Sequence, residues 1–132
     1  MSLPNLNSQS KTYDFGLDSV VIRKYVSGIA GGRTLDLTNF STTDTVIKAG
    51  HVVIYDTVNK VYRPMPLSGT AYASLPSNHV YVGVLNTTVA KEAPLASIMN
   101  IGTVNIKAVP FAMDDILSAF KSAVPTIVWE ND

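Results

Sequence analysis

The sequence predicts a small, mainly β domain of the α+β type, sandwich- or barrel-like, with one C-terminal helix and an extended N-terminal arm. Runs rich in valine, isoleucine and tyrosine recur along the chain between glycines, prolines and asparagines, which is the pattern of short strands and turns. Only one stretch, near the C-terminus, has the spacing of a helix. The length of 132 residues suits one compact domain.

Residues 1–18 are expected to form the arm and residues 19–132 the single β-rich domain. The arm segment is polar, and its apolar residues follow neither the strand period nor the helix period. A segment of this composition becomes ordered only on a partner. Its candidate contacts with a partner are Leu3, Leu6, Tyr13 and Phe15.

Short strands follow in the domain. Gly50 suits a tight bend before the strand 51–56, and Asp56 with Asn59 suits a hairpin turn after it. Gly83 indicates a bulge or a close approach of another backbone, and Gly102 a break between two runs. The predicted strands are 19–27, 33–37, 46–48, 51–56, 61–63, 79–85, 96–101, 103–109 and 126–129.

The helix is predicted over 113–123. Ile116, Phe120 and Ala123 fall on one apolar stripe at helical spacing, with Leu117 beside them. Acidic residues in the first turn and a lysine in the last complement the helix dipole, and Pro125 prevents continuation.

Composition excludes several classes of protein. The chain has no cysteine, so disulfides, thiolate zinc sites, iron–sulfur clusters and a cysteine nucleophile are excluded. Ten basic and ten acidic residues balance, which argues against a nucleic-acid partner. We find neither a signal-peptide pattern nor an apolar membrane span, so we expect synthesis in the cytoplasm and no membrane partner.

The sequence gives little reason to expect an enzyme. His51 and His79 each open a predicted strand, without a second ligand at metal-binding spacing, and are interpreted as strand-edge or capping residues. No serine stands in a nucleophile-elbow motif. We therefore expect no catalytic residue, no metal and no cofactor.

A charge-poor region points instead to a protein interface. Between residues 64 and 106 the only charged residues are Lys91 and Glu92. Specific interfaces are depleted of charge at their centres. The loop 67–78 is long enough to be functional, and Leu67, Tyr72 and Leu75 are its candidate contacts with other copies or another protein.

Four segments together carry a family resemblance. They are VIKAGHVVIYD (46–56), YRPM (62–65), YVGVLNTTV (81–89) and IGTVNIKAVPF (101–111), the last followed by the helix. This order resembles the capsid decoration proteins of tailed phages, of the lambda head protein D type, and related head-fibre proteins. The resemblance covers about residues 45–128.

The resemblance implies a non-enzymatic homotrimer that docks on the outside of an assembled capsid and clamps the major capsid protein. The arm, with Leu3, Leu6, Tyr13 and Phe15, would reach onto the shell. The longer N-terminal part of this chain leaves open whether it is a plain decoration protein or the base of a head fibre, with fibre or adhesin proteins as further partners.

Two other functions stay open from the sequence. A small β-rich carbohydrate- or peptide-binding module would use the loop 67–78 and an exposed Tyr72. A compact hydrolase would need His51 or His79 beside a nucleophile.

Overall fold

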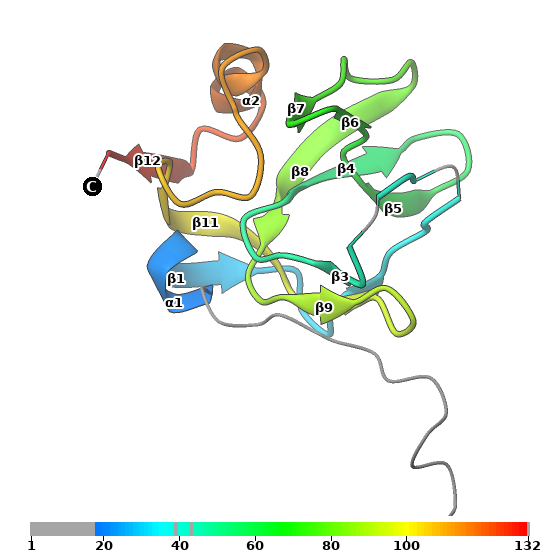
Figure 1. The fold of residues 1–132 in the computed structure, drawn as a ribbon, viewed down its shortest axis with the longest axis horizontal. Coiled ribbons are helices and arrows are strands. Elements are labelled where there is room, and N and C mark those ends of the chain that lie inside the picture. The colour runs from blue at the N-terminus through cyan, green and yellow to red at the C-terminus, as the bar shows by residue number, and fades with distance from the viewer. Residues whose placement is uncertain (1–17, 39, 43, 132) are drawn as a thin grey trace, which may run out of the picture.

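The computed structural model describes residues 18–38, 40–42 and 44–131. Within these residues the chain forms twelve short strands and two short helices (Figure 1). In chain order the elements are α1 (Asp18–Val21), β1 (Ile22–Gly28), β2 (Arg33–Thr34), β3 (Val46–Ile47), β4 (Val52–Asp56), β5 (Val61–Pro64), β6 (Leu67–Ser68), β7 (Ala71–Tyr72), β8 (His79–Leu85), β9 (Val89–Ala90), β10 (Leu95–Ala96), β11 (Ile98–Asn105), α2 (Leu117–Ala123) and β12 (Ile127–Glu130). The predicted mainly β class with a C-terminal helix is confirmed.

A six-stranded sheet forms the centre of the domain. Its strands run in the order β1-β11-β8-β4-β5, all antiparallel, and β12 lies parallel to β11. β11 is long enough to pair with β1 on one side and, on the other, with β8 near its start and β12 near its end. The sheet therefore opens between β8 and β12.

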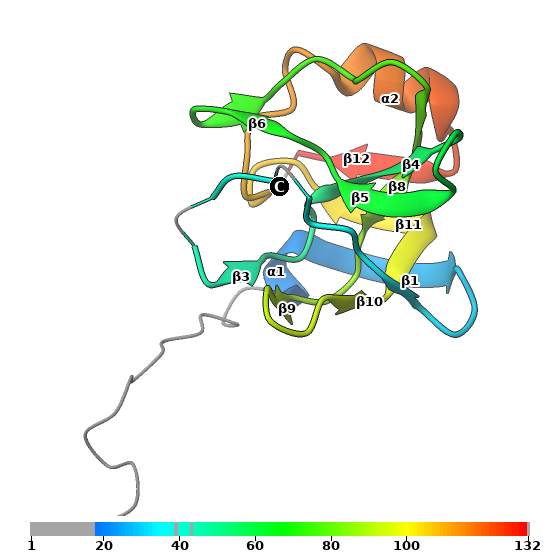
Figure 2. The same ribbon diagram turned by 90° about the vertical axis from the view of Figure 1, so that its right-hand side faces the viewer.

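Three two-stranded sheets and α2 cover the central sheet. Figure 2 shows α2 and β6 on one side of it and β3, β9 and β10 on the other. Each side encloses a separate apolar core. The larger includes Val52, Ile54 and Phe120, and the smaller includes Val53 and Leu85. The alternation of Val52, Val53 and Ile54 between the two cores explains why β4 is apolar at successive positions.

Phe120 of α2 fills the opening between β8 and β12. Its ring is fully buried and packs at 5.4 Å, centroid to centroid, against both Tyr81 of β8 and Trp129 of β12. Ile116 is also buried, as predicted, but Ala123 is exposed and the next residue, Val124, completes the stripe. The prediction for Ala123 is wrong because the buried positions follow a spacing of four, 116, 120 and 124; the regular helix also begins only at Leu117, after turns at 114–116.

The predicted hairpin between 51–56 and 61–63 is confirmed. The Asp56 carboxylate accepts hydrogen bonds from the main-chain N–H groups of Val58 and Asn59, which is how an aspartate stabilises a turn. Lys60, with φ of 59°, occupies the left-handed position that closes it. Local side-chain chemistry therefore fixes the register of β4 and β5.

Three predicted elements differ from the structure. The strand 19–27 begins with one helical turn, α1, which buries Val21, so tertiary packing outweighs β-propensity there. The runs on either side of Gly102 belong to one strand, β11, which ends at Asn105 instead of 109. The loop 67–78 contains the small hairpin β6–β7. None of the described helices has the length and apolar character needed to cross a membrane.

Candidate functional site

The structure describes three of the seven predicted contact residues, Leu67, Tyr72 and Leu75. Leu3, Leu6, Tyr13 and Phe15 lie outside the described residues. Leu67 and Leu75 are half-buried against the larger core.

Tyr72, expected on the surface of the loop 67–78, is buried in the larger core, and this expectation is wrong. Its hydroxyl accepts a hydrogen bond from the Val52 main-chain N–H over 3.1 Å. The phenol thus anchors the β6–β7 hairpin to the central sheet, and burial raises its pKa. Tyr72 is a structural residue and is not available to a partner.

His51 directly precedes β4, at the end of a strand as interpreted, but it is buried in the same cluster as Tyr72. Its ring stands edge-on to the rings of Phe40, Tyr72 and Phe111, with centroids 5.3–5.5 Å apart. Burial lowers the pKa of His51 to about 4. The imidazole is neutral at physiological pH and packs as part of an aromatic core.

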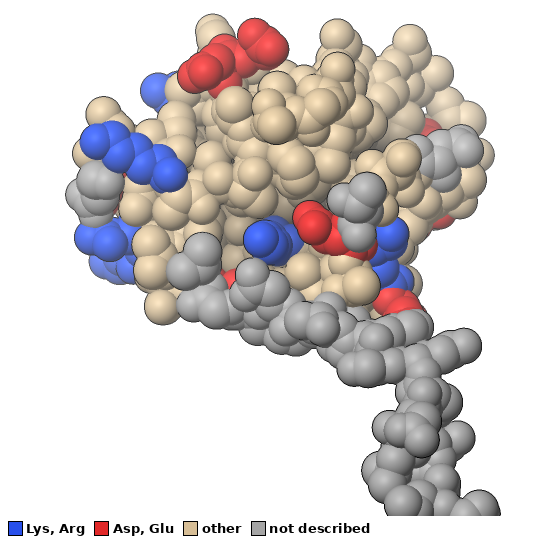
Figure 3. Space-filling view, viewed as in Figure 1, with Lys and Arg blue, Asp and Glu red and all other residues tan. Residues whose placement is uncertain are grey.

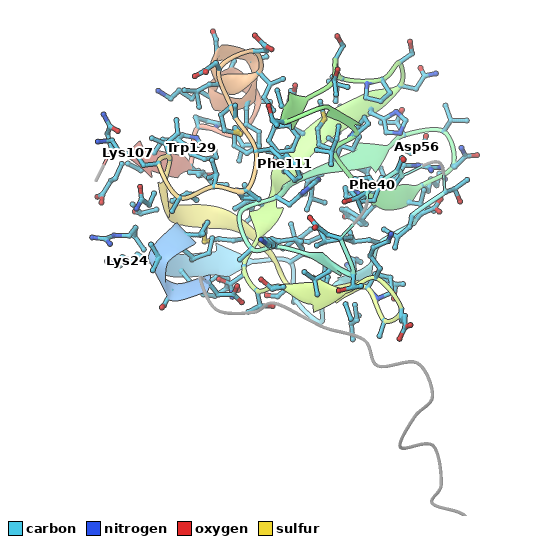
Figure 4. The ribbon with its side chains drawn as sticks, viewed as in Figure 1. Lys24, Phe40, Asp56, Lys107, Phe111 and Trp129 are labelled. Atoms are coloured by element: carbon cyan, nitrogen blue, oxygen red, sulfur yellow. The ribbon has the colours of Figure 1, made fainter. Side chains whose placement is uncertain are left out.

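A groove at the β4–β5 end of the domain is lined by polar residues that are far apart in the sequence. It has a volume of about 310 Å³. Figure 4 places Phe40 and Asp56 at this end, and Lys107 and Trp129 at the opposite one. The lining residues are Asp36, Thr38, Phe40, Ile54, Asp56, Arg63, Pro64, Pro66, Pro76 and His79.

Arg63 ties the charged part of the groove together. Its guanidinium lies 3.1 Å from the Asp36 carboxylate and 3.5 Å from that of Asp56. Hydrogen bonds from the main chain and the side-chain amide of Asn59 lower the pKa of Asp56 to about 2. The hydroxyl and main-chain N–H of Thr38 lower the pKa of Asp36. Both carboxylates are therefore ionised and held by fixed donors.

His79 completes the groove from the first position of β8. Its Nδ1 donates a hydrogen bond to the Ser77 carbonyl oxygen over 2.8 Å, and its Nε2 faces an Asp56 carboxylate oxygen at 3.7 Å. β4 and β8 bring these residues together because Asp56 pairs with His79 in the ladder. The strand-edge interpretation of His79 is thus confirmed, with an ionic neighbour that the sequence alone did not indicate.

The polar groups of the groove interact with one another. Thr38 supplies the groove's one hydroxyl, and that hydroxyl donates to the Asp36 carboxylate over 2.6 Å. The described part of the chain contains no cluster of three or more histidine, aspartate or glutamate side chains able to hold a metal ion. The groove offers fixed charges beside an apolar wall, which are the elements of a recognition site.

Exposed apolar side chains gather at the other end of the sheet. Of the eight large apolar side chains that are exposed among the described residues, five belong to α1, β1, β11 and β12. These elements are neighbours, since β11 pairs with both β1 and β12 and contacts α1. We call them the β1–β12 surface, made of Val20, Tyr25, Val26, Ile101 and Val128.

Charge is sparse over the centre of the domain. Figure 3 shows the face of Figure 1 as mostly uncharged, with acidic side chains at the top, over α2, basic ones along the left margin, and a few side chains of both signs in its lower half. The charge-poor sequence from 64 to 106 contributes β8 and β11 of the central sheet and four strands, β6, β7, β9 and β10, of the small sheets that cover it. Low charge therefore reflects both a large share of buried strand and a partly uncharged surface.

The arm joins the domain at a fixed point. Asp18, which the sequence placed at the end of the arm, begins α1, and its carboxylate accepts hydrogen bonds from the hydroxyl and the main-chain N–H of Thr88. The Thr88 hydroxyl in turn accepts from the Ala49 N–H over 3.1 Å. Asp18 is thus held at the start of α1, next to Val20 of the β1–β12 surface.

Comparisons of this chain with protein-family models, with curated proteins and with solved structures found no match.

Proposed function

We propose that this protein is a structural virion protein that binds the outside of an assembled phage capsid and stabilises it, as a decoration protein or as the base of a head fibre. The observation that supports the proposal is the position of the segments that resemble decoration proteins: three of them lie on adjacent strands of one sheet. The segments 46–56, 81–89 and 101–111 include β4, most of β8 and the second half of β11, which are consecutive strands of the central sheet from β4 to β11. Motifs that are separate in sequence thus form one structural unit.

Two glycines of these motifs have positions that demand glycine. Gly50 has φ of 89°, and a Cβ there would collide with the Val21 side chain. A Cβ on Gly83 would overlap the Met99 main-chain oxygen on the neighbouring strand. These two glycines of the motifs are therefore required by the backbone of this domain.

The β1–β12 surface supplies an area for docking. Exposed apolar side chains on neighbouring elements mark interaction sites in soluble proteins. Exposed Arg23 and Lys24 of β1 and Glu130 of β12 flank these side chains along the same strands, as polar residues flank the apolar centre of an interface. This surface is better suited to a protein partner than the loop 67–78, whose Tyr72 is buried.

The arm would add to this docking surface. Because Asp18 is fixed to Thr88, residues 1–17 start beside the β1–β12 surface and reach a partner that lies against it. The partners in this proposal are the major capsid protein, two further copies of this chain in a homotrimer and, at the base of a fibre, head-fibre or adhesin proteins. Three copies together convert modest contacts into stable attachment.

The test measures attachment to shells assembled from the major capsid protein of the same phage. The wild-type chain should sediment as a trimer, free or attached, and should bind these shells and raise their unfolding temperature. Deletion of residues 1–15 should abolish binding while leaving the unfolding of the isolated domain unchanged.

A matched pair of charge substitutions tests the docking surface. Val26→Glu in β1 should reduce shell occupancy, whereas Val58→Glu, at the tip of the β4–β5 hairpin and also exposed to solvent, should not. Wild-type occupancy for both the deletion and Val26→Glu, or a monomer free and on shells, would overturn the proposal.

A further inference from the structure

We propose that the groove lined by Asp36, Phe40, Arg63 and His79 binds a neutral saccharide of one or two pyranose rings. This inference is independent of capsid attachment, because the groove lies at the β4–β5 end of the sheet and the β1–β12 surface at the other end.

The size and construction of the groove suit a small ligand. Its volume of about 310 Å³ lies at the small end of the range for small-molecule sites. Four separate segments build it: the turn after β2, the β4–β5 hairpin, the residues after β5 and the approach to β8. Such convergence of distant segments holds the walls in place before a ligand arrives.

One wall of the groove is apolar and stiff. Phe40, Pro64, Pro66 and Pro76 contribute it, and proline rings lose little conformational freedom when a ligand covers them. Phe40 is itself held in place, because its ring stands edge-on to buried His51 at 5.5 Å. A pyranose ring presents C–H groups on its faces, and their burial against this wall is favourable.

The other wall offers hydrogen-bond donors and acceptors side by side. Asp36 accepts only, Arg63 donates only, and His79 presents Nε2 next to Asp56. The Arg63 Nε–H is buried and has no hydrogen-bond partner among the described residues. A sugar hydroxyl both donates and accepts, so adjacent hydroxyls match a mixed set of this kind.

The charge balance of the groove favours a neutral ligand over an ion. Arg63 lies between the two carboxylates, within 3.5 Å of each. An anion at Arg63 would be repelled by Asp36 and Asp56, and a cation at Asp36 would be repelled by Arg63. Neutral hydroxyl groups can form hydrogen bonds with Arg63 and the two carboxylates without breaking their ion pairs.

The neighbouring backbone disfavours an extended peptide. β5 is the edge strand on this side of the sheet, where a peptide would add as a further strand. The chain itself occupies that edge, because the Asp36 N–H donates to the Tyr62 carbonyl oxygen over 2.8 Å and Leu35 forms a bridge with Tyr62. A compact ligand in the groove does not need this edge.

The test is a titration of the ¹⁵N-labelled full chain, followed by the shifts of its amide resonances. The probes are D-glucose, D-galactose, D-mannose, N-acetyl-D-glucosamine and N-acetyl-D-galactosamine at millimolar concentrations. At least one should give saturable shifts confined to Thr38, Phe40, Arg63 and His79. Sodium acetate and methylammonium chloride, as charged probes, should not.

Two variants and a matched control tie binding to the groove. Phe40→Ala and Asp36→Asn should each weaken binding of the responding sugar by about tenfold or more, as expected for the loss of one wall contact or one good hydrogen bond. Asp114→Asn, an exposed carboxylate before α2, should leave it unchanged. Unfolding curves of all three variants confirm that each one folds.

Three results would overturn the inference. The first is that none of the five sugars gives a saturable shift, and the second is that acetate or methylammonium shifts the same amides equally. The third is that a peptide probe, decaproline or tetralysine, gives saturable shifts at these amides while no sugar does. None of these results bears on capsid attachment. Conversely, Phe40→Ala should decorate shells like the wild type, so that each of the two proposals fails or stands independently.

Discussion

His51 Nε2 donates a hydrogen bond to the main-chain oxygen of Met65 over 3.0 Å. His51 directly precedes β4 and Met65 directly follows β5, so this bond closes the open end of the hairpin whose other end Asp56 closes. Since a carbonyl oxygen only accepts, Nε2 carries the proton of the neutral ring. Burial of the ring, and not this bond, favours the uncharged imidazole in the folded domain.

Acid should destabilise the domain through His51. Burial lowers its pKa from 6.5 to about 4, so between these pH values the unfolded chain binds a proton that the folded chain does not. The free energy of unfolding is thus unaffected by His51 above pH 6.5 and falls as the pH drops toward 4. Each tenfold change in proton affinity is worth about 1.4 kcal/mol, so the whole window costs about 3 kcal/mol. Urea unfolding at a series of pH values measures it.

The variant His51→Gln keeps an amide donor for Met65 and removes the titration. Its free energy of unfolding should vary much less than that of the wild type between pH 6.5 and 4. The pKa of Asp56 is lowered from 3.8 to about 2, so stability due to this carboxylate is lost only below pH 3.8, outside the window. An unchanged acid slope in His51→Gln would contradict the assignment.

Phe120→Ala should cost about 3 to 5 kcal/mol of folding free energy. The ring is fully buried and holds β8 and β12 together through Tyr81 and Trp129, so its removal leaves a cavity where the sheet opens. Ala123→Ser, at the exposed position of the same helix, should change stability by less than about 0.5 kcal/mol. Chemical unfolding of both variants makes the comparison, and equal stabilities would contradict the proposed role of Phe120.

Elements that depend on interactions between residues close together in the chain were predictable from the sequence. The β4–β5 hairpin follows from Asp56 and Asn59, whose side chains act on main-chain groups within three residues. The same holds for the apolar stripe through Ile116 and Phe120, which depends only on helical spacing. Short-range chemistry determines these elements whatever the rest of the fold does.

The groove could not be predicted, because strand pairing creates it. Asp56 and His79 meet through the register of β4 on β8, and Arg63 meets Asp36 because the turn after β2 lies along β5. A shift of one residue in either pairing would separate these side chains. The exposure of Tyr72 was mispredicted for the same reason, since its hydroxyl is buried by a contact with β4.

Gly83→Ala should be strongly destabilising. A Cβ at this position would overlap the Met99 main-chain oxygen, and a backbone atom on a paired strand has little room to move. We expect a loss of about 2 kcal/mol or more, as for other overpacked sites. Gly69→Ala is the matched control: with φ of 67° and no neighbouring atom within 4 Å, it should incur only the left-handed backbone cost of about 1 kcal/mol. Urea midpoints in the opposite order would refute the close approach of β8 and β11.

Thr88→Val should weaken the attachment of Asp18 to the domain. The Thr88 hydroxyl donates to the Asp18 carboxylate and accepts from the Ala49 N–H, so valine, which has the same shape, removes both bonds at once. Ala49 is buried, and its N–H would be left without a partner, at a cost of about 1 to 3 kcal/mol.

Thr87→Val provides the control for this substitution, because Thr87 is the exposed neighbour on the same turn, and its loss should stay within about 0.5 kcal/mol. Amide hydrogen exchange adds a local readout: the Ala49 amide should lose its protection in Thr88→Val and keep it in Thr87→Val. If both variants unfold at the same urea concentration and the Ala49 amide exchanges at the wild-type rate in each, Thr88 does not fix Asp18 to the domain. The arm would then have no fixed starting point beside the β1–β12 surface.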